Sequence, residues 1–476
     1  MIEGYMIEGE AKARNALDRH AAYFARLLEE RDAQLHGANQ KAALSEITLE
    51  FENIRAAWNW ALECENPIWL EAMLECLRGY AELRGRFLET LELFKLGHQR
   101  IDNTWQVSVP ELHSRLLAGH GEALFRLGRN NEAQPMLEAA LSDLEQLASD
   151  HHMPVLLVHA ELLFRRGELN RAKLEAQTVI DSASLKIHRL EHHDLEHHRL
   201  TDALQLKGSI LAQQGEYETA NIALEQTLAE YKAAGNRIKY ADTLIELCIV
   251  WHNSGSKSLD EIGEATRQAL EIQREFGDNQ GMISTLSNLG YMHGLRHEYE
   301  QAWAAYRESL SLATRFGLNN EILRNRFRMA GLEQDTNQFE RAYGQFQVCA
   351  AQARAQQNHW ILVRSIGSLG EIALELERFD QARAHFQESI RLAWNANETP
   401  TVLTLLSIIS YLEETTDPVW AQQLGTLIAQ HPSAQARDRA DAHILLERLA
   451  LVTQPTETLS LETVVKRLLE QEYPVK

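Results

Sequence analysis

Three short segments decide the fold: Thr285-Leu-Ser-Asn-Leu-Gly290, Tyr299-Glu-Gln-Ala302 and Tyr306-Arg-Glu-Ser-Leu310. Together they place an alanine twelve residues after a glycine, with bulky side chains nearby. The pattern recurs in Gly121–Ala133, Gly208–Ala220 and Gly370–Ala382, and more loosely in Ala160–Ala172, Val250–Ile262 and Ala330–Ala342. Positions 133, 172, 220, 262, 302, 342 and 382 are separated by 39, 48, 42, 40, 40 and 40 residues. A period near 40 predicts stacked helix pairs, because one pair cannot bury its apolar face alone.

The centre of the chain lacks helix-breaking residues. No proline occurs between Pro154 and Pro400, which indicates helices joined by very short turns. Phe276-Gly277 and Phe316-Gly317 are typical of helix C-termini, where glycine adopts the left-handed conformation. We therefore predict an all-α fold, a right-handed superhelical solenoid of stacked antiparallel helix pairs with repeats of about 40 residues.

The repeat pattern predicts three regions. These are an N-terminal helical region at 1–105, an array of about seven helix pairs at 106–400, and a C-terminal helical cap at 401–476. Pro418, Pro432 and Pro455 divide the cap into three or four shorter helices, of which 434–451 is the clearest. Such a cap is expected because the terminal units of a solenoid are usually atypical.

The composition of the chain disfavours two classes of partner, nucleic acid and membrane. The chain has 47 Lys and Arg residues against 68 Asp and Glu, a formal charge of −21, which disfavours direct binding of nucleic acid. The four cysteines are scattered without a CxxC pair, as in a reducing cytoplasm. The most apolar run, Val402–Leu412, is far shorter than the roughly 20 residues that cross a bilayer. We expect a cytoplasmic protein that binds neither nucleic acid nor membrane.

The repeat motif resembles the tetratricopeptide repeat, in a form with about 40 residues. The best copy is the one quoted first, and Ser368-Leu-Gly370, Phe379-Asp-Gln-Ala382 and Phe386-Gln-Glu-Ser-Ile390 form a second. In this repeat the glycine and the alanine let paired helices approach closely, and the aromatic residues fill the space to neighbours. The resemblance implies a concave surface lined by the first helix of each pair.

A second resemblance covers both ends of the chain. Gly9-Glu-Ala-Lys-Ala-Arg14, Arg19-His-Ala-Ala-Tyr-Phe24 and Glu50-Phe-Glu-Asn-Ile-Arg-Ala-Ala-Trp-Asn-Trp-Ala-Leu62 resemble the segment after the winged helix in bacterial STAND regulators, the signal-transduction ATPases with numerous domains. Gln423-Leu-Gly425 and residues 431–449 resemble their closing helices. The resemblance implies a helical sensor that binds an inducer or restrains an ATPase switch. It suggests a sensor region detached from that switch, or a standalone relative.

A histidine-rich segment is the strongest candidate for metal binding. Residues 187–200 contain two HxxEH sequences, at His188–His192 and His193–His197. Histidines four apart share one face of a helix and can bind zinc together, as in some zinc peptidases. No third ligand or pocket is identifiable, so adventitious or regulatory metal binding and a solvated extended helix remain the alternatives. We assign no metal, no cofactor and no catalytic residue.

The concave groove is the candidate binding surface that remains. The resemblance to tetratricopeptide repeats implies that side chains flanking the packing positions of the first helices face a partner. Arg324, Arg328 and Arg364 in successive repeats would form an exposed cationic strip for a carboxylate-bearing peptide. The alternative is that each arginine pairs with a neighbouring glutamate. The full set of candidate residues is Arg115, Glu122, Asn288, Tyr291, Arg324, Arg328, Arg364 and Glu371.

Three functions are compatible with these patterns. The first is a non-enzymatic sensor and interaction module that binds a peptide, protein or small inducer in the groove and regulates an associated STAND ATPase switch. The second is a standalone scaffold that joins protein partners. The third and weakest is a metal-dependent enzyme.

The sequence predicts that the chain itself does not use ATP. It has no GxxxxGK[ST] loop, because His252-Asn-Ser-Gly-Ser-Lys-Ser258 lacks the upstream glycine. The purified chain should therefore give no saturable heat on titration with Mg·ATP and release no phosphate. Saturable binding in calorimetry would contradict this prediction.

Overall fold

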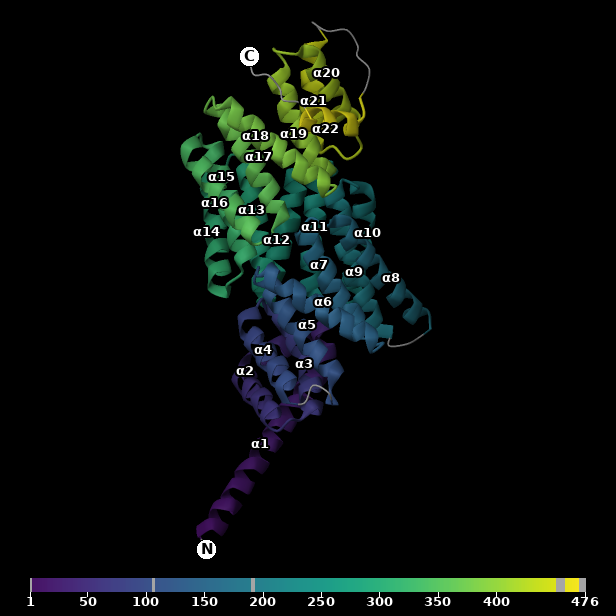
Figure 1. The fold of residues 1–476 in the computed structure, drawn as a ribbon, viewed down its shortest axis with the longest axis vertical. Coiled ribbons are helices and arrows are strands. Elements are labelled where there is room, and N and C mark those ends of the chain that lie inside the picture. Colours follow the sequence, from purple (N-terminus) through teal and green to yellow (C-terminus); the bar gives the residue numbers. More distant parts are fainter. Residues whose placement is uncertain (1, 105–107, 190–192, 451–458, 471–476) are drawn as a thin grey trace.

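The computed structural model describes residues 2–104, 108–189, 193–450 and 459–470, and these residues are helical almost throughout. Figure 1 shows an elongated stack of helices with the two chain ends at opposite ends of the molecule. The first helices are α1 (Ile2–Asp32), the short 3-10 helix η1 (Ala33–His36), α2 (Gln40–Glu63), α3 (Pro67–Arg84) and α4 (Phe87–Thr104). The C-terminal ones are α19 (Thr399–Glu413), α20 (Pro418–Gln430), α21 (Ala436–Leu449) and α22 (Leu461–Glu470).

Seven antiparallel helix pairs lie between them. They are α5 (Pro110–Arg126) with α6 (Asn130–Gln146), α7 (His152–Arg165) with α8 (Leu169–His188), α9 (His193–Gln214) with α10 (Tyr217–Ala234), α11 (Arg237–Ser254) with α12 (Leu259–Phe276), α13 (Asn279–Leu295) with α14 (Tyr299–Phe316), α15 (Asn319–Asp335) with α16 (Phe339–Ala355), and α17 (His359–Glu375) with α18 (Phe379–Asn395). Each of the seven predicted anchor positions falls on the second helix of a pair and is buried. The predicted all-α solenoid of helix pairs is confirmed. The three region boundaries remain a prediction.

The repeat pattern works through close approach inside each pair. A Cβ atom added at Gly290 would lie 2.6 Å from the ring of Tyr306, and one at Gly370 would lie 2.7 Å from the ring of Phe386. Both aromatic rings are almost fully buried. The glycine on the first helix therefore makes room for the aromatic ring that the second helix inserts against it.

The 48-residue spacing in the sequence has a simple structural origin. The helices α8 and α9, with 20 and 22 residues, are longer than the 17 or 18 residues usual in the later pairs. The extra residues therefore lengthen helices on both sides of this junction, and the stacking order of the pairs is unchanged.

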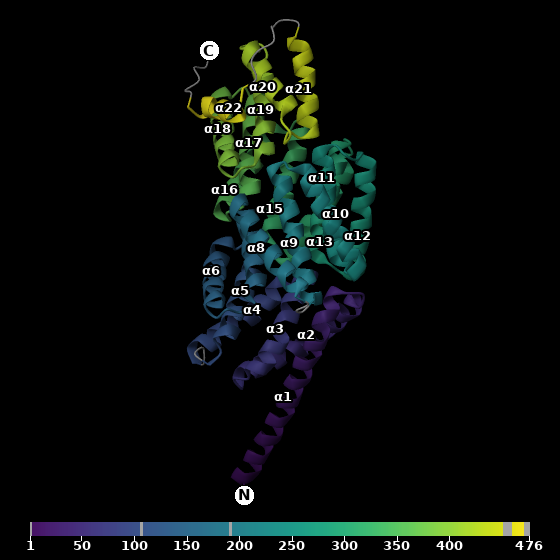
Figure 2. The same ribbon diagram turned by 90° about the vertical axis from the view of Figure 1, so that its right-hand side faces the viewer.

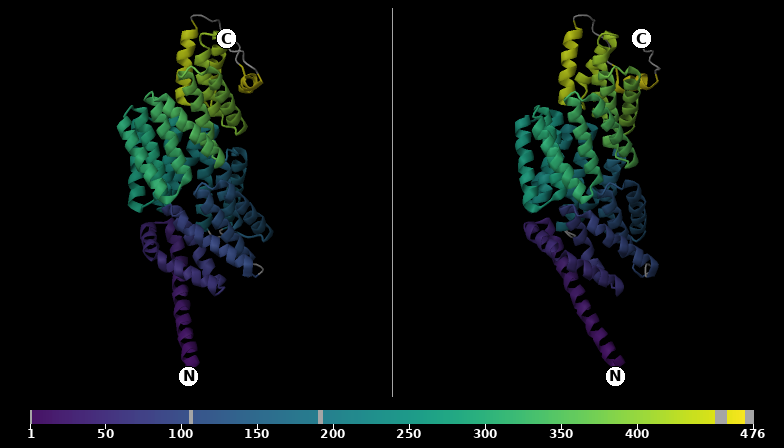
Figure 3. Two further views of the ribbon diagram at one scale, coloured as in Figure 1. Left: turned by 60° about the vertical axis from the view of Figure 1, so that its left-hand side comes forward. Right: turned by 90° about the vertical axis from the view of Figure 1, so that its left-hand side faces the viewer.

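The superhelix is wound so tightly that successive turns touch. The turn that ends α3 lies against the start of α13, since Asn279 Nδ2 donates to the carbonyl oxygen of Arg84 over 2.7 Å. Likewise Asn130 at the start of α6 donates to the carbonyl oxygen of Gln356 after α16, over 2.7 Å. Figures 2 and 3 show that the purple and blue N-terminal helices adjoin the teal and green helices of the later pairs. We call this contact between turns the seam.

The two ends of the chain extend the stack in different ways. The first part of α1 projects from the body, whereas α1 from Ala21 onward packs against α2 and α3 (Figures 1 and 2). At the other end α19, α20 and α21 continue the pairwise stacking, and the predicted helix at 434–451 is found as α21. Within the described ranges, no helix combines the length and apolar content needed to span a bilayer.

The close approach at Gly370 predicts that a glycine-to-alanine substitution has opposite effects on stability at Gly370 and at Gly344. Gly370→Ala should lower the melting temperature, because overpacking a buried site costs about 1–3 kcal/mol and exceeds the gain of up to about 1 kcal/mol in helix propensity. Gly344→Ala in α16 is the matched control, since no heavy atom beyond the adjacent residues and the backbone of its own helix lies within 4 Å of the added Cβ, and it should raise the melting temperature. Thermal unfolding followed by circular dichroism checks both. A Gly370→Ala protein as stable as the control would contradict the packing argument.

Candidate functional site

Charged side chains on the first helices of the pairs meet inside the superhelix. Arg78 on α3 binds Glu122 on α5, and Lys239 on α11 binds Glu82 on α3, although 157 residues separate the last two. These contacts join helices that are neighbours in the array and helices of successive turns. The inner surface is therefore charged and largely enclosed, and two parts of it differ in how their charges are satisfied.

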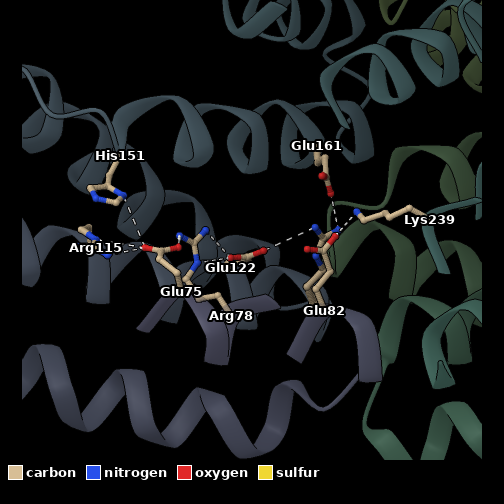
Figure 4. A network of polar contacts seen from close by, with 9 residues as sticks. Glu75, Arg78, Glu82, Arg115, Glu122, His151, Glu161 and Lys239 are labelled. Carbon is tan, nitrogen blue, oxygen red and sulfur yellow. Dashed lines mark hydrogen bonds and ion pairs between the residues drawn. The ribbon is translucent and has the colours of Figure 1, made fainter. Parts of the chain in front are cut away.

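The first part is a network on α3, α5, α7 and α11, which we call the N-terminal charge network (Figure 4). Arg78 Nη2 lies 2.8 Å from Glu122 Oε2, and Arg115 Nη2 lies 2.9 Å from Glu75 Oε1. Arg126 also pairs with Glu161. The members of the network are Glu75, Arg78, Glu82, Arg115, Glu122, Arg126, His151, Glu161 and Lys239.

The cations and carboxylates of the network compensate one another. Burial alone would raise the pKa of Glu75, but the guanidinium groups of Arg78 and Arg115 outweigh it and lower that pKa to about 2. At Glu82, burial likewise raises the pKa, but the ammonium group of Lys239 outweighs it and the pKa is lowered to about 2. Both carboxylates are thus held ionised by fixed cations. Arg115 and Glu122, which the sequence nominates for the groove, are part of this paired network.

The second part combines arginines with aromatic rings on α13, α15 and α17. The guanidinium carbon of Arg328 lies 4.3 Å from the ring centroid of Tyr291 and 5.6 Å from that of Trp360. The guanidinium carbon of Arg364 lies 4.4 Å from the Trp360 centroid. Rings and cations alternate at cation–π distances. We call Tyr291, Arg328, Trp360 and Arg364 the cation–aromatic cluster.

The three arginines of the predicted strip differ in their partners. Arg324 Nη1 lies 3.2 Å from Glu321 Oε2, and Arg364 Nη1 lies 3.3 Å from Glu398 Oε2. Burial lowers the pKa of Arg364, although Glu398 opposes this effect. Arg328 has no carboxylate partner in the described ranges, and its Nε atom is buried without a hydrogen-bond acceptor there. Arg324 and Arg364 are therefore paired with glutamates, as the alternative interpretation expects, whereas Arg328 is not.

The strip is less exposed than the sequence analysis expected. The side chains of Arg324 and Arg364 are only 21% and 26% exposed, because the winding of the superhelix covers the inner helix faces. Asn288 and Tyr291 are half-buried on α13. Glu371 accepts a hydrogen bond from Gln334 Nε2 over 2.8 Å, and burial raises its pKa.

Trp360 was missed by the sequence analysis. It precedes Arg364 by four residues on α17, so both side chains lie on one helix face. That spacing was a usable signal. The pairing of Glu82 with Lys239 had no comparable signal, because it depends on contact between superhelical turns.

The two HxxEH sequences of the histidine-rich segment begin at the last residue of one helix and at the first residue of the next. Helix α8 ends at His188 and α9 begins at His193, so a single helical face cannot present both HxxEH sequences. His192 lies outside the described residues. His197 lies on α9 and is half-buried. Among the side chains that the structure describes, no group of three potential ligands is arranged to hold a metal ion.

Comparisons with known proteins agree with the fold. A tetratricopeptide repeat family model matches residues 363–393, which cover most of α17 and α18. No curated protein matches the sequence. The structure of a Rap protein complexed with Competence and Sporulation Factor is similar, with a TM-score of 0.57, 13% identity, and coverage of 81% of this chain and 99% of that chain.

Two further solved structures are less similar. The Rap conjugation gene regulator of plasmid pLS20, in complex with the Phr* peptide, has a TM-score of 0.49 at 13% identity and covers 78% of this chain and 97% of its own. The apo form of the quorum sensor NprR from B. thuringiensis has a TM-score of 0.45 at 13% identity and covers 81% and 99%. The chain is thus a tetratricopeptide-like solenoid whose fold is similar to that of a Rap protein.

The lowered pKa of Glu75 predicts how its contribution to stability depends on pH. The folded-state pKa near 2 lies below the ordinary value of 4.5, so the ion pairs stabilise the fold above about pH 5 and lose this effect as the pH falls towards 2. Glu75→Gln should therefore lower the melting temperature strongly at pH 7, and the difference from the unsubstituted protein should shrink with acidification. Glu71→Gln, exposed on the same helix, should show no such trend. A difference independent of pH would contradict the ion-pair argument.

Proposed function

We propose that this chain is a cytoplasmic, non-enzymatic regulator that binds a peptide or an extended protein segment inside its superhelix. The ligand carries at least one carboxylate, which Arg328 receives between the rings of Tyr291 and Trp360. The observation that carries this proposal is the guanidinium group of Arg328, which is flanked by aromatic rings and has no carboxylate partner in the described ranges.

The energetic argument compares Arg328 with the other inner arginines. A cation taken out of water is costly unless it is paired, and the arginines of the N-terminal charge network are paired with glutamates. Aromatic rings stabilise Arg328 by about 0.5–2 kcal/mol in total. A charge-assisted hydrogen bond to its guanidinium group would add roughly 1.5–3 kcal/mol to this. An incoming carboxylate would therefore gain more at Arg328 than at any arginine already paired with glutamate.

The likeness in fold supports ligand binding by a chain of this architecture. The Rap protein of the similar structure is complexed with Competence and Sporulation Factor. The inner surface of this chain offers what an extended peptide needs. It has aromatic faces, a free guanidinium group, and the side-chain amide of Asn288 beside Tyr291 on α13.

The finer proposal is that ligand binding regulates an associated STAND ATPase switch. The support for this is the sequence resemblance at 9–62 and 423–449. A gene for a winged-helix ATPase with a GxxxxGK[ST] loop, in the same reading frame or beside it, is expected. The selected ligand should then change the rate of ATP hydrolysis by that ATPase. An unchanged rate, or no such gene, would favour the standalone scaffold that joins protein partners.

Peptide selection on Arg328 variants tests the binding site. A display library of random heptapeptides, selected on the purified chain, should become enriched in Asp and Glu. Arg328→Gln should weaken binding of a selected peptide by at least about tenfold, because one hydrogen bond to a charged group is worth roughly 1.5–3 kcal/mol. Fluorescence anisotropy measures the affinity. Arg328 is preferred over Arg364, whose replacement would strand the buried carboxylate of Glu398.

The matched control is Arg326→Gln, two residues away on α15 but exposed on the opposite face. It should bind the same peptide as tightly as the unsubstituted chain. Melting temperatures of both variants show whether they fold. If no peptide is enriched, or if Arg328→Gln binds as tightly as Arg326→Gln, Arg328 does not receive a ligand and the proposal is wrong.

A further inference from the structure

A cavity lies at the seam, away from the cation–aromatic cluster. It has a volume of about 180 Å³. The cavity lies between the α3–α4 turn and the end of α14, two segments far apart in the sequence. Its lining residues are Gly85, Arg86, Leu88, Glu89, Arg315 and Phe316.

Two glycines bring these segments together. Gly85 ends α3 with φ 64°, which turns the chain sharply into α4. Gly317 ends α14 with φ 68°, and a Cβ atom added there would lie 3.0 Å from Leu88 Cδ1. Because each segment supplies part of the wall, the cavity exists only while the two superhelical turns are stacked.

The polar lining has unused binding capacity for both signs of charge. Arg315 is exposed, packs over the ring of Phe316, and has no carboxylate partner in the part of the chain that the structure describes. Arg86 is already engaged, because its Nη1 donates to the hydroxyl of Tyr80 over 3.2 Å and its Nη2 lies 3.3 Å from Glu89 Oε1. The other oxygen, Glu89 Oε2, is buried and accepts no hydrogen bond from any described residue. The cavity therefore offers the exposed guanidinium group of Arg315, the partly exposed carboxylate of Glu89, one oxygen of which accepts no hydrogen bond from any described residue, and the apolar surfaces of Leu88 and Phe316.

We propose that this cavity binds a free α-amino acid with an apolar side chain. Its carboxylate binds Arg315, its ammonium group donates to the carboxylate of Glu89, and its side chain packs on Leu88 and Phe316. The volume is below the roughly 300–1,000 Å³ of pockets for drug-sized ligands, so the occupant is a small metabolite. An inorganic anion would leave Glu89 and the apolar wall unused, and an internal peptide residue carries neither terminal charge.

Binding at this place would act on the winding of the superhelix. The ligand contacts Glu89 from one turn and Arg315 from the other, so it binds the stacked arrangement better than an opened one. The amino acid should therefore raise the melting temperature as its concentration increases, by mass action. This site does not depend on the proposed peptide site, because the two share no residue.

Isothermal titration calorimetry of the full chain with L-leucine and L-phenylalanine tests the proposal. One of them should bind saturably with one site per chain. N-acetyl-L-leucine lacks the ammonium group and L-leucinamide lacks the carboxylate, so each should bind at least about tenfold more weakly than L-leucine. Arg315→Ala should weaken binding at least about tenfold. Arg307→Ala, exposed on the same helix, and Arg328→Gln should leave it unchanged.

The outcomes separate this site from others. Saturable binding that Arg315→Ala abolishes and Arg328→Gln preserves supports the cavity at the seam. No saturable heat with either amino acid overturns the proposal, and so does binding of either derivative as tightly as L-leucine. Because Arg315 is exposed, its replacement should not impair folding, and an unchanged melting temperature of the unliganded variant verifies this.

Discussion

The enclosure of charge inside a tightly wound superhelix is the constraint on which the rest of this structure depends. The first helices carry arginines, lysine and glutamates on their inner faces, and contact between turns removes much of this surface from water. Partly buried charges must be paired or they destabilise the fold. The N-terminal charge network meets this requirement with Arg78 and Glu122, Arg115 and Glu75, and Lys239 and Glu82. It thereby joins successive turns by ion pairs.

The same constraint separates structural from functional charge. An arginine with a glutamate partner contributes to winding, and a ligand would have to break an existing pair to bind it. Arg328 is compensated by two aromatic rings instead, so its hydrogen-bonding capacity is available. The cavity at the seam follows the same logic on a smaller scale, with Arg315 and Glu89 Oε2 as its unused groups. Both proposed sites are thus places where pairing is incomplete.

The positions of the candidate residues show which contacts a local sequence pattern can indicate. Arg328 and Tyr291, nominated from their positions beside the packing residues, do meet, because helix periodicity places such residues on the inner face. Trp360 was missed although its spacing from Arg364 pointed to the same face. Arg324 and Arg364 are only partly exposed, because exposure depends on how far the inner face is covered by the next turn.

The sequence by itself determined the helix pairs, their period and their close packing. Gly370 and Phe386 are neighbours within one repeat, so a local pattern of small and bulky residues encodes their contact. Only the tertiary structure decided which turns touch and which charges pair, as for Lys239 with Glu82 across 157 residues. The physical reason is that the rotation between neighbouring helix pairs accumulates along the stack. Each pair adds a small rotation to the stack, and the sum of many such rotations, which no single repeat encodes, brings distant residues together.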